Sequence, residues 1–261
     1  MRSSTLIAWA YLAAAAIFIF LPVVVLVQFS FQDGILPVPP FKGMSLRWYE
    51  KVWENRRLTA GLGNSVLVAL LSSLAATTLG FLAAYGLARS RPRLAGLIQY
   101  ALMAPITVSY LIIGMGLLMT FNMLGVPKSL LAVGIGHVVI NLPLAFAIIY
   151  SQLGEHQANV ERAAHDLGAS DLQALVLVTL PMVWPAVLAA FVISATLSWD
   201  EFVIAFLLSR FDVTLPVVIW SMLRSGLSPE LNAAGTIVFA ISVALVAAVE
   251  VLLRRGRHGN G

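Results

Sequence analysis

Long apolar stretches are the feature that most limits the folds open to this chain. A hydrocarbon core of about 30 Å takes roughly 20 apolar helical residues to cross. Backbone groups that face lipid have no water to bind, so a spanning segment must be helical unless it belongs to a closed barrel. The sequence lacks the short alternating segments that barrel strands need. We therefore expect an all-α polytopic membrane protein of six helices, with spans at approximately residues 6–29, 62–88, 95–124, 129–153, 183–208 and 232–253.

Composition supports a membrane protein and excludes several functions. Hydrophobic residues make up 60% of the 261 residues and charged residues 11%, whereas soluble domains carry about 25% charged residues. With no cysteine, disulfides, thiol catalysis and cysteine metal sites are excluded. The 16 Lys and Arg against 12 Asp and Glu are scattered over short loops, which argues against nucleic-acid binding. We treat residues 1–261 as one transmembrane domain, with 6–29 retained as a membrane anchor because it is too long for a signal peptide.

The loops favour an orientation with both termini in the cytoplasm. Six spans place the termini on one side, and the basic residues divide evenly, eight to each side. The positive-inside bias depends on short loops close to the span ends. The densest such clusters are Arg-Ser-Arg-Pro-Arg at 89–93 and Arg-Arg-Gly-Arg at 254–257, and both lie on the side of the termini.

Prolines interrupt two of the expected spans. Pro105 and Pro143 lie in the third and fourth apolar stretches, where each removes a backbone hydrogen bond and is expected to bend the helix. Ordinary packing of a helix bundle explains such residues, since Gly and Pro are common in membrane helices. The alternative is that the bends line a path for a substrate.

A polar segment at residues 155–181, which we call the elbow, separates the fourth and fifth apolar stretches. Small apolar residues recur there at helical spacing: Val160, Ala163, Ala164 and Leu167. Charged and polar residues take the other faces: Glu161, Arg162, His165 and Asp166. A helix that lies in the membrane interface prefers large apolar residues, so a face that is half alanine favours docking into a groove of another protein. An interfacial helix is the alternative.

Capping signals divide the elbow into two helices. Asn159 is the expected N-cap of the first helix and Gly168 its left-handed C′ residue. Ser170-Asp-Leu-Gln173 matches the capping box that starts a second helix. We expect Leu180-Pro181 to end that second helix before the fifth span.

The elbow resembles the loop that marks permease subunits of binding-protein-dependent ABC importers. The family pattern is Glu-Ala-Ala, three residues, Gly, nine residues, Ile, any residue and Leu-Pro. This chain has Arg162-Ala-Ala164, Gly168, Val178 and Leu180-Pro181 at the same spacing. Val replaces Ile, and Arg162 stands at the acidic position with Glu161 one residue earlier.

The resemblance extends over nearly the whole chain and is greatest to the second permease subunits of spermidine/putrescine importers. It includes several further segments: Leu46-Arg-Trp-Tyr49, Asn64-Ser65, His137 with Asn141-Leu-Pro143, and Leu197-Ser-Trp-Asp-Glu-Phe-Val203. Leu46–Trp53 alone is open to two interpretations, a helix of the interfacial aromatic belt or part of a binding-protein dock, and we favour the belt.

The resemblance implies a fold, a set of partners and a coupling site. It implies a type I ABC importer permease bundle in the bacterial inner membrane, paired with a second homologous permease subunit, supplied by a periplasmic binding protein and driven by a cytoplasmic ABC ATPase dimer. Members of the family insert this loop into a groove of the ATPase. The coupling residues so implied are Glu161, Arg162, Ala163, Ala164, Asp166, Leu167, Gly168, Leu180 and Pro181, and the charged contact falls to Glu161 or to Arg162.

We expect the chain not to be an enzyme. It has no G-x-x-x-x-G-K-[S/T] phosphate loop, and none of its lysines, at positions 42, 51 and 128, lies in such a context. The chain itself therefore carries no cofactor, and the partner ATPase uses ATP and Mg²⁺. We expect no metal site, because His137 and Asn141, which share a helix face, have too few further ligands nearby; an inter-helical hydrogen bond is the favoured role.

Two adjacent acids in the fifth span, Asp200 and Glu201, are candidates for the substrate path. An acid within the membrane is by default a functional hypothesis, and carboxylates suit a cationic substrate. The equally weighted alternative is a helix cap or an inter-helix bond. Iron, aminophosphonate and opine substrates stay open. A stand-alone secondary transporter or channel, or a membrane-embedded enzyme, are competing functions, although we find neither an internal inverted repeat nor a paired catalytic constellation.

Overall fold

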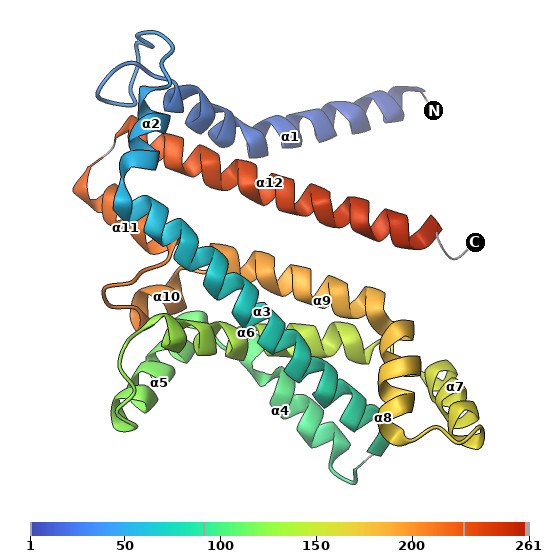
Figure 1. Ribbon diagram of the computed structural model, residues 1–261. Helices are drawn as coiled ribbons and strands as arrows, with labels where there is room; N and C mark the ends of the chain where they lie inside the picture. The colour runs from blue at the N-terminus through green and yellow to red at the C-terminus, as the bar shows by residue number, and fades with distance from the viewer. Residues whose placement is uncertain (1, 91, 227, 259–261) are drawn as a thin grey trace. The chain divides into compact units, whose positions relative to one another are not determined.

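The computed structural model describes residues 2–90, 92–226 and 228–258, and its regular elements there are helices (Figure 1). In chain order the helices are α1 (Arg2–Ser30), α2 (Arg47–Glu54), α3 (Arg56–Ser90), α4 (Ala95–Thr107), α5 (Tyr110–Met123), α6 (Leu130–Tyr150), α7 (Glu155–Asp166), α8 (Asp171–Gln173), the π-helical turn η1 (Ala174–Thr179), α9 (Leu180–Asp200), α10 (Val203–Leu208), α11 (Leu215–Ser225) and α12 (Pro229–His258).

The chain forms two compact units. The first comprises Met1–Thr59 and Val218–Ala244, and the second comprises Ala60–Val217 with Leu245–Gly261. The elbow, both candidate acids and the expected second to fifth spans lie in the second unit, which is where the candidate site is found.

Four described helices are long and apolar enough to cross a membrane: Ile7–Ser30, Arg56–Ser90, Leu130–Tyr150 and Asp171–Asp200. The bent pair formed by α4 and α5 makes a fifth span if it is counted as one. These helices confirm an all-helical membrane architecture. The sixth expected stretch lies within α12, whose described apolar part, Pro229–Ala244, is shorter, so the count of six stays a prediction.

The third expected span is broken shortly after the proline that it contains. Pro105 lies in the last turn of α4, and α5 starts at Tyr110 after a bend of 105°. Val108 takes an extended conformation and the hydroxyl of Ser109 accepts the backbone N–H of Leu111, so α5 begins with its own cap. Pro143, in contrast, is buried inside α6, which continues unbroken from Leu130 to Tyr150.

The fifth expected span, 183–208, is also two helices rather than one. α9 ends at Asp200 and α10 begins at Val203. The carboxylate of Glu201 accepts the backbone N–H groups of Val203, Ile204 and Ala205. A carboxylate in this position satisfies the orphan donors of the new helix and favours its N-terminal dipole. The apolar pattern alone does not reveal this break.

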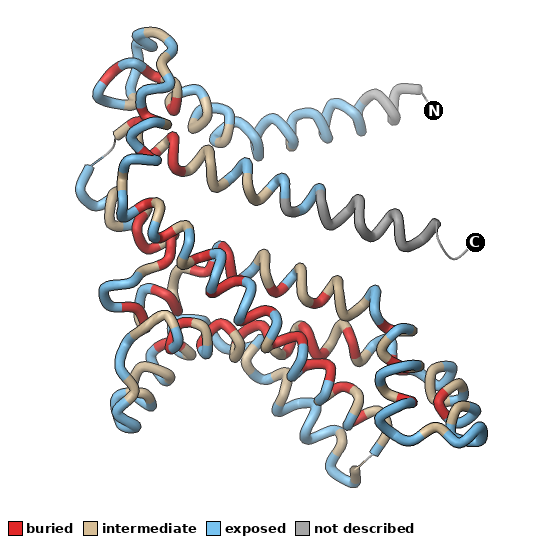
Figure 2. The backbone as a smooth tube through the Cα atoms, in the orientation of Figure 1, coloured by how far each residue is buried: buried red, intermediate tan, exposed pale blue. Residues whose placement is uncertain are grey.

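The core of the second unit lies where α3, α6 and α9 pack together, and the buried residues of Figure 2 follow these helices. Small residues allow the close approach: Ala84, Ala145 and Ala190 are fully buried. At Gly80 an added Cβ would lie 2.9 Å from the backbone nitrogen of Phe146 and 3.0 Å from the Cβ of Ala145. A side chain at this position would therefore push α3 away from α6.

The first unit contains a loop that is organised around a buried glutamine. The side-chain amide of Gln32 donates to the carbonyls of Val38 and Pro40 and accepts the N–H of Lys42. The indole of Trp48 on α2 donates to the backbone carbonyl of Gln32 at 2.7 Å. The helix expected at Leu46–Trp53 is therefore present as α2 and is fixed to the loop that precedes it.

Candidate functional site

The first helix of the elbow, α7, begins about one turn before the expected N-cap, Asn159. α7 starts at Glu155 with Gly154 as its N-cap. The expectation that Asn159 caps this helix is wrong, because Asn159 lies inside α7, where its side-chain carbonyl accepts a hydrogen bond from Arg162. An extended glycine turns the chain without any side-chain cap, and the acid of Glu155 in the first turn suits the helix dipole.

The C-terminus of α7 has the geometry expected of it. Gly168 has a φ of +91°, in the left-handed region. The N–H of Gly168 donates to the carbonyl of His165 at 2.9 Å, and the N–H of Ala169 donates to the carbonyl of Ala164 at 3.0 Å. These two bonds form a Schellman motif, so Gly168 is the C′ residue. The sharp turn of the elbow therefore depends on this glycine.

The second elbow helix starts as expected but does not end as expected. In the capping box the N–H of Gln173 donates to Ser170 Oγ, and the N–H of Ser170 donates to Gln173 Oε1. The helix then continues through η1 into α9, so that Asp171–Asp200 forms one helix of 30 residues. The expectation that Leu180-Pro181 closes it is wrong. Pro181 falls in the first turn of α9, directly after the wider turn of η1, where its missing N–H is tolerated.

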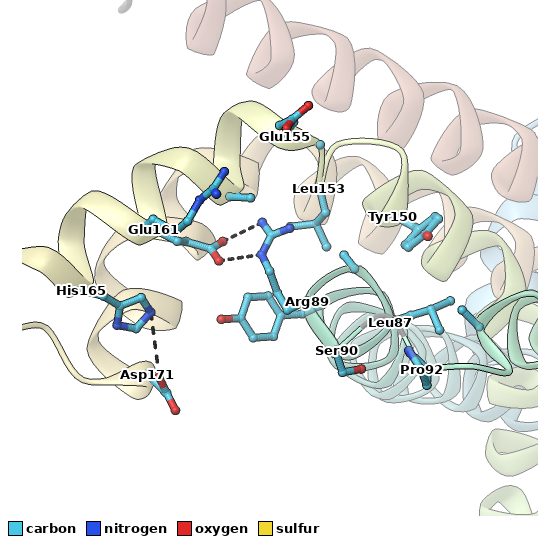
Figure 3. Close-up of a pocket in the computed structure, with 16 residues that line it drawn as sticks. Leu87, Arg89, Ser90, Pro92, Tyr150, Leu153, Glu155, Glu161, His165 and Asp171 are labelled. Carbon is cyan, nitrogen blue, oxygen red and sulfur yellow. Dashed lines mark hydrogen bonds and ion pairs between the residues drawn. The ribbon is translucent and has the colours of Figure 1, made fainter.

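A buried ion pair attaches α7 to the end of α3. Arg89 Nε donates to Glu161 Oε2 at 2.6 Å, and Arg89 Nη2 donates to Glu161 Oε1 at 2.8 Å (Figure 3). The Glu161 side chain is only 5% exposed and that of Arg89 is 21% exposed. Two parallel bonds in a fixed fork make this the strongest type of side-chain pairing available to an arginine.

Thr179 adds a third helical segment to this ion pair. Its hydroxyl donates to Glu161 Oε1 at 2.5 Å from a fully buried position in η1. The same hydroxyl lies 3.3 Å from the carbonyl of Ala174, five residues back in the same turn. Glu161 therefore connects three segments: the C-terminal end of α3, helix α7 and the η1 turn that leads into α9.

The surroundings of Glu161 keep it ionised. Burial raises the pKa of its carboxyl group, but hydrogen bonds from Arg89 and Thr179, together with the charges of Arg89 and His165, outweigh burial and leave the pKa lowered from its ordinary value. Removing one partner of such a buried pair leaves an uncompensated charge, which costs about 3–5 kcal/mol.

A cavity of about 1070 Å³ adjoins the ion pair. It is lined by the end of α3, the start of α4, the C-terminal end of α6 and the inner face of α7, and Arg89, Glu161, His165 and Asp171 contribute charged or titratable groups (Figure 3). Within the part of the chain that the structure describes, no cluster of three or more His, Cys, Asp or Glu could hold a metal ion.

The expected coupling residues divide between two faces of the elbow. Glu161 lies on the inner face, whereas Arg162, Ala163, Asp166 and Leu167 are exposed, the last at 91%. Ala164 is half-buried. The glutamate that stands beside the acidic position of the family pattern is therefore used inside the chain. The charged coupling residues that stay exposed are Asp166 and Arg162, and Arg162 also lines the cavity beside Glu161.

Sequence reasoning missed two members of this site. Arg89 was assigned only to a basic turn that fixes orientation, and Thr179 occupies a position where the family pattern accepts any residue. No local signal joins Arg89 to Glu161, which follows it by 72 residues. The available signal is that Glu161 lies on a different face of the helix from Val160, Ala163 and Ala164.

The two candidate acids of the fifth span have different environments. Glu201 is 5% exposed and caps α10, while its Oε2 lies 3.5 Å from Nε2 of His137. Asp200 is exposed. The expected inter-helical hydrogen bond of His137 is present, because its Nδ1 lies 2.6 Å from Ser198 Oγ on α9. Asn141, on the same face of α6, makes no such bond within the described residues.

Comparison with known proteins identifies a family and several relatives. A family model described as "Binding-protein-dependent transport system inner membrane component" matches residues 76–257. The spermidine/putrescine transport system permease protein PotC of Shigella flexneri is 30% identical over 256 residues, which cover 96% of this chain and 95% of the relative. The putrescine transport system permease protein PotI of Escherichia coli strain K12 is 33% identical over 229 residues, covering 85% and 81% respectively.

Solved structures with the same fold include permeases of ABC transporters. A bacterial alginate ABC transporter in complex with an alginate pentasaccharide-bound periplasmic protein aligns with a TM-score of 0.76 and 18% identity, covering 97% of this chain and 95% of that chain. The MetNI methionine ABC transporter in an inward-facing conformation aligns with a TM-score of 0.66 and 15% identity, covering 79% and 97%. At these identities the likeness shows the fold alone.

Proposed function

Because the chain belongs to the family of binding-protein-dependent transport system inner membrane components, we propose that its elbow, residues 155–181, couples the membrane helices to a cytoplasmic ATPase. The chain is a permease subunit of an ABC importer.

The observation that carries the coupling proposal is the bonding of Glu161 to Arg89 and Thr179. A force applied to α7 reaches α3 through the bidentate ion pair and reaches the helix of the fifth span through Thr179. Buried, charge-assisted bonds hold this geometry more firmly than exposed ones would. Glu161 thus acts as an anchor within the chain rather than as a contact to the ATPase.

The outer face of α7 is the surface that we assign to the ATPase. Ala163 and Leu167 are exposed and small or apolar, with Arg162 and Asp166 beside them. Leu167 is an apolar side chain that is 91% exposed on a polar helix. Covering it with a protein groove lowers the free energy and so favours docking. Arg162 would supply the charged contact.

The partners follow from the importer assignment. We propose a second homologous permease subunit to complete the pore, a periplasmic binding protein to deliver substrate, and a cytoplasmic ABC ATPase dimer that binds ATP and Mg²⁺. The chain would lie in the bacterial inner membrane with six spans and both termini in the cytoplasm. That orientation puts the Arg89 turn and the elbow on the ATPase side, in agreement with the basic loop at 89–93.

The proposed substrate is a polyamine such as spermidine or putrescine. The relatives that match nearly the whole chain carry these substrates in their names. The exposed carboxylate of Asp200 at the end of α9 suits an amine cation, while Glu201 holds the break that leaves Asp200 at a helix end. Iron, an aminophosphonate or an opine are the alternative substrates.

Purification and reconstitution test the proposal. The tagged chain, expressed with the genes of a cognate ATPase, permease and binding protein, is purified and placed in proteoliposomes. We expect the ATPase and the second permease to co-purify, and uptake of labelled spermidine or putrescine to require both ATP and the binding protein. Uptake by the chain alone without ATP would instead establish a secondary transporter.

A further inference from the structure

The helices α3, α6 and α9 contain buried polar side chains in successive layers. In the first layer His137 Nδ1 lies 2.6 Å from Ser198 Oγ, and Ser198 Oγ lies 3.0 Å from Ser72 Oγ. These three side chains, one from each helix, are at most 3% exposed. They bond to one another across the helix interfaces, while His137 Nε2 has no hydrogen bond among the described residues and lies 3.5 Å from Glu201 Oε2.

The next layer has polar atoms for which the described part of the chain offers no partner. Asn141 follows His137 by four residues on α6, and Ser194 precedes Ser198 by four residues on α9. The two helices run in opposite directions, since Ser198 contacts His137 while Ala190 shares a buried cluster with Ala145. Asn141 and Ser194 therefore belong to the same layer, one turn along from the first.

The third helix has a buried polar group at the same height. Ser72 belongs to the layer of His137 and Gly80 meets Ala145, so α3 runs parallel to α6, and Thr77, five residues after Ser72, lies at about the height of Asn141. Within the described residues, Asn141 Oδ1, Asn141 Nδ2, Ser194 Oγ and Thr77 Oγ1 are all buried and lack a hydrogen-bond partner. Buried polar groups in native proteins almost always have a partner, whether protein or ordered solvent.

The chemistry of the four atoms selects one kind of ligand. The amide of Asn141 needs an acceptor for Nδ2 and a donor for Oδ1, and each hydroxyl can do either. A metal cation would satisfy the oxygens but leave Nδ2–H without an acceptor, whereas an anion would satisfy Nδ2 but leave Oδ1 without a donor. Water both donates and accepts, and buried water typically makes about three hydrogen bonds.

We propose that Asn141, Ser194 and Thr77 bind ordered water between α3, α6 and α9. The site is separate from the elbow and from Asp200, and it holds whether or not the substrate is a polyamine. Water can exchange one partner for another as helices shift, so polar atoms that share it stay satisfied in more than one packing arrangement.

A structure of the assembled wild-type importer, determined at a resolution that shows ordered water, tests the proposal. We expect density at hydrogen-bond distance, about 2.7–3.2 Å, from the Asn141 amide and from at least one of Ser194 Oγ and Thr77 Oγ1. A variant with Asn141→Leu, Ser194→Ala and Thr77→Val should lose this density, whereas Ser73→Ala should keep it, because Ser73 already donates to the carbonyl of Ala69.

Three results would overturn the proposal. The first is direct hydrogen bonding between Asn141 and Ser194 or Thr77 with nothing between them. The second is a layer without density in which the four atoms stay unpaired. The third is density coordinated by oxygen atoms alone that is replaced by rubidium or thallium, which would identify a monovalent cation.

Discussion

Arg89 and Glu161, 72 residues apart in the sequence, are joined by two hydrogen bonds of 2.6 and 2.8 Å at the point where α3 meets α7. The family pattern places an acid one residue later, at the position of Arg162. In this chain the neighbouring acid points inward, and its position in the structure explains why: it fixes the elbow to the membrane helices. Arg162 and Asp166 are the charged coupling residues that stay exposed.

Replacing Arg89 tests whether this ion pair transmits motion. Arg89→Gln leaves Glu161 buried without its cation, which is expected to weaken the attachment of α7 by about 3–5 kcal/mol. We expect ATP-dependent uptake in proteoliposomes to fall at least about tenfold (about 1.4 kcal/mol), while ATP hydrolysis loses its dependence on the binding protein. Arg93→Gln, in the exposed part of the same basic turn, is the control and should transport normally. Wild-type uptake by Arg89→Gln would refute the coupling role.

Thr179 supplies a weaker, separable part of the attachment. Thr179→Val keeps the shape of the side chain but removes the donor to Glu161 Oε1, and hydrogen bonds to charged groups contribute about 1.5–3 kcal/mol. We expect a lower thermal stability of the purified complex and a smaller loss of uptake than in Arg89→Gln. Thr196→Val serves as the control, because Thr196 donates to the carbonyl of Val192 in its own helix. Equal losses for both valine variants would mean that the Glu161 contact is not special.

The lowered pKa of Glu161 predicts a specific dependence on pH. A carboxyl group whose folded-state pKa is lowered stabilises the fold above its ordinary pKa, about 4.3, and this stabilisation disappears as pH falls through the lowered value. The melting temperature of the detergent-solubilised complex should therefore decline on acidification below about pH 4.3. In Glu161→Gln this part of the decline should be absent, so that the two curves converge at low pH. Parallel curves over the whole range would show that Glu161 does not titrate as argued.

The outer face of α7 can be blocked without disturbing the inner face. Ala163 is exposed, so Ala163→Trp should leave insertion and folding intact while preventing the helix from entering a groove. We expect the ATPase to be lost from the purified complex and uptake to fall to background. Gln152→Trp, an exposed position just after α6, controls for a bulky aromatic residue on this side of the protein. Retention of the ATPase by Ala163→Trp would place the docking surface elsewhere.

Asp200 and Glu201 should respond differently to neutralisation. Glu201→Gln weakens the cap of α10, so we expect a lower melting temperature together with reduced uptake. Asp200→Asn removes an exposed charge, so we expect an unchanged melting temperature and a higher KM for spermidine. Kinetics of uptake and a thermal-shift measurement on each variant separate the two roles. An unchanged KM in Asp200→Asn would remove Asp200 from the substrate path.

The sequence predicted those features that local physics determines. Apolar length predicted the helical spans, Gly168 predicted the left-handed turn, and Ser170 with Gln173 predicted the capping box. Local signals failed to predict the start of α7, because Gly154 begins this helix without a side-chain cap. They also failed at Leu180-Pro181, because the π-helical turn lets the helix pass through the proline.

Contacts between distant segments could not be predicted in this way. The break at Glu201 lies in an apolar stretch. Glu201 is recognised as a helix cap only because, in the structure, its carboxylate accepts three backbone N–H groups. The pairing of Arg89 with Glu161 depends on how α3 and α7 are placed by the core around Gly80, Ala145 and Ala190. Such placement is decided by packing over the whole second unit rather than by any short pattern.

The helix Asp171–Asp200 changes direction within its first half. The π-helical turn η1 widens it at Ala174–Thr179, and Pro181 and Pro185 follow at the start of α9; helices bend at such features, and α8 with η1 lies at a steep angle to α9 (Figure 1). Thr179, which bonds to Glu161, lies at the end of η1. The elbow therefore holds this helix beside its bend, so that a rotation of α7 would change the angle between the two parts of the helix rather than shift it along its length.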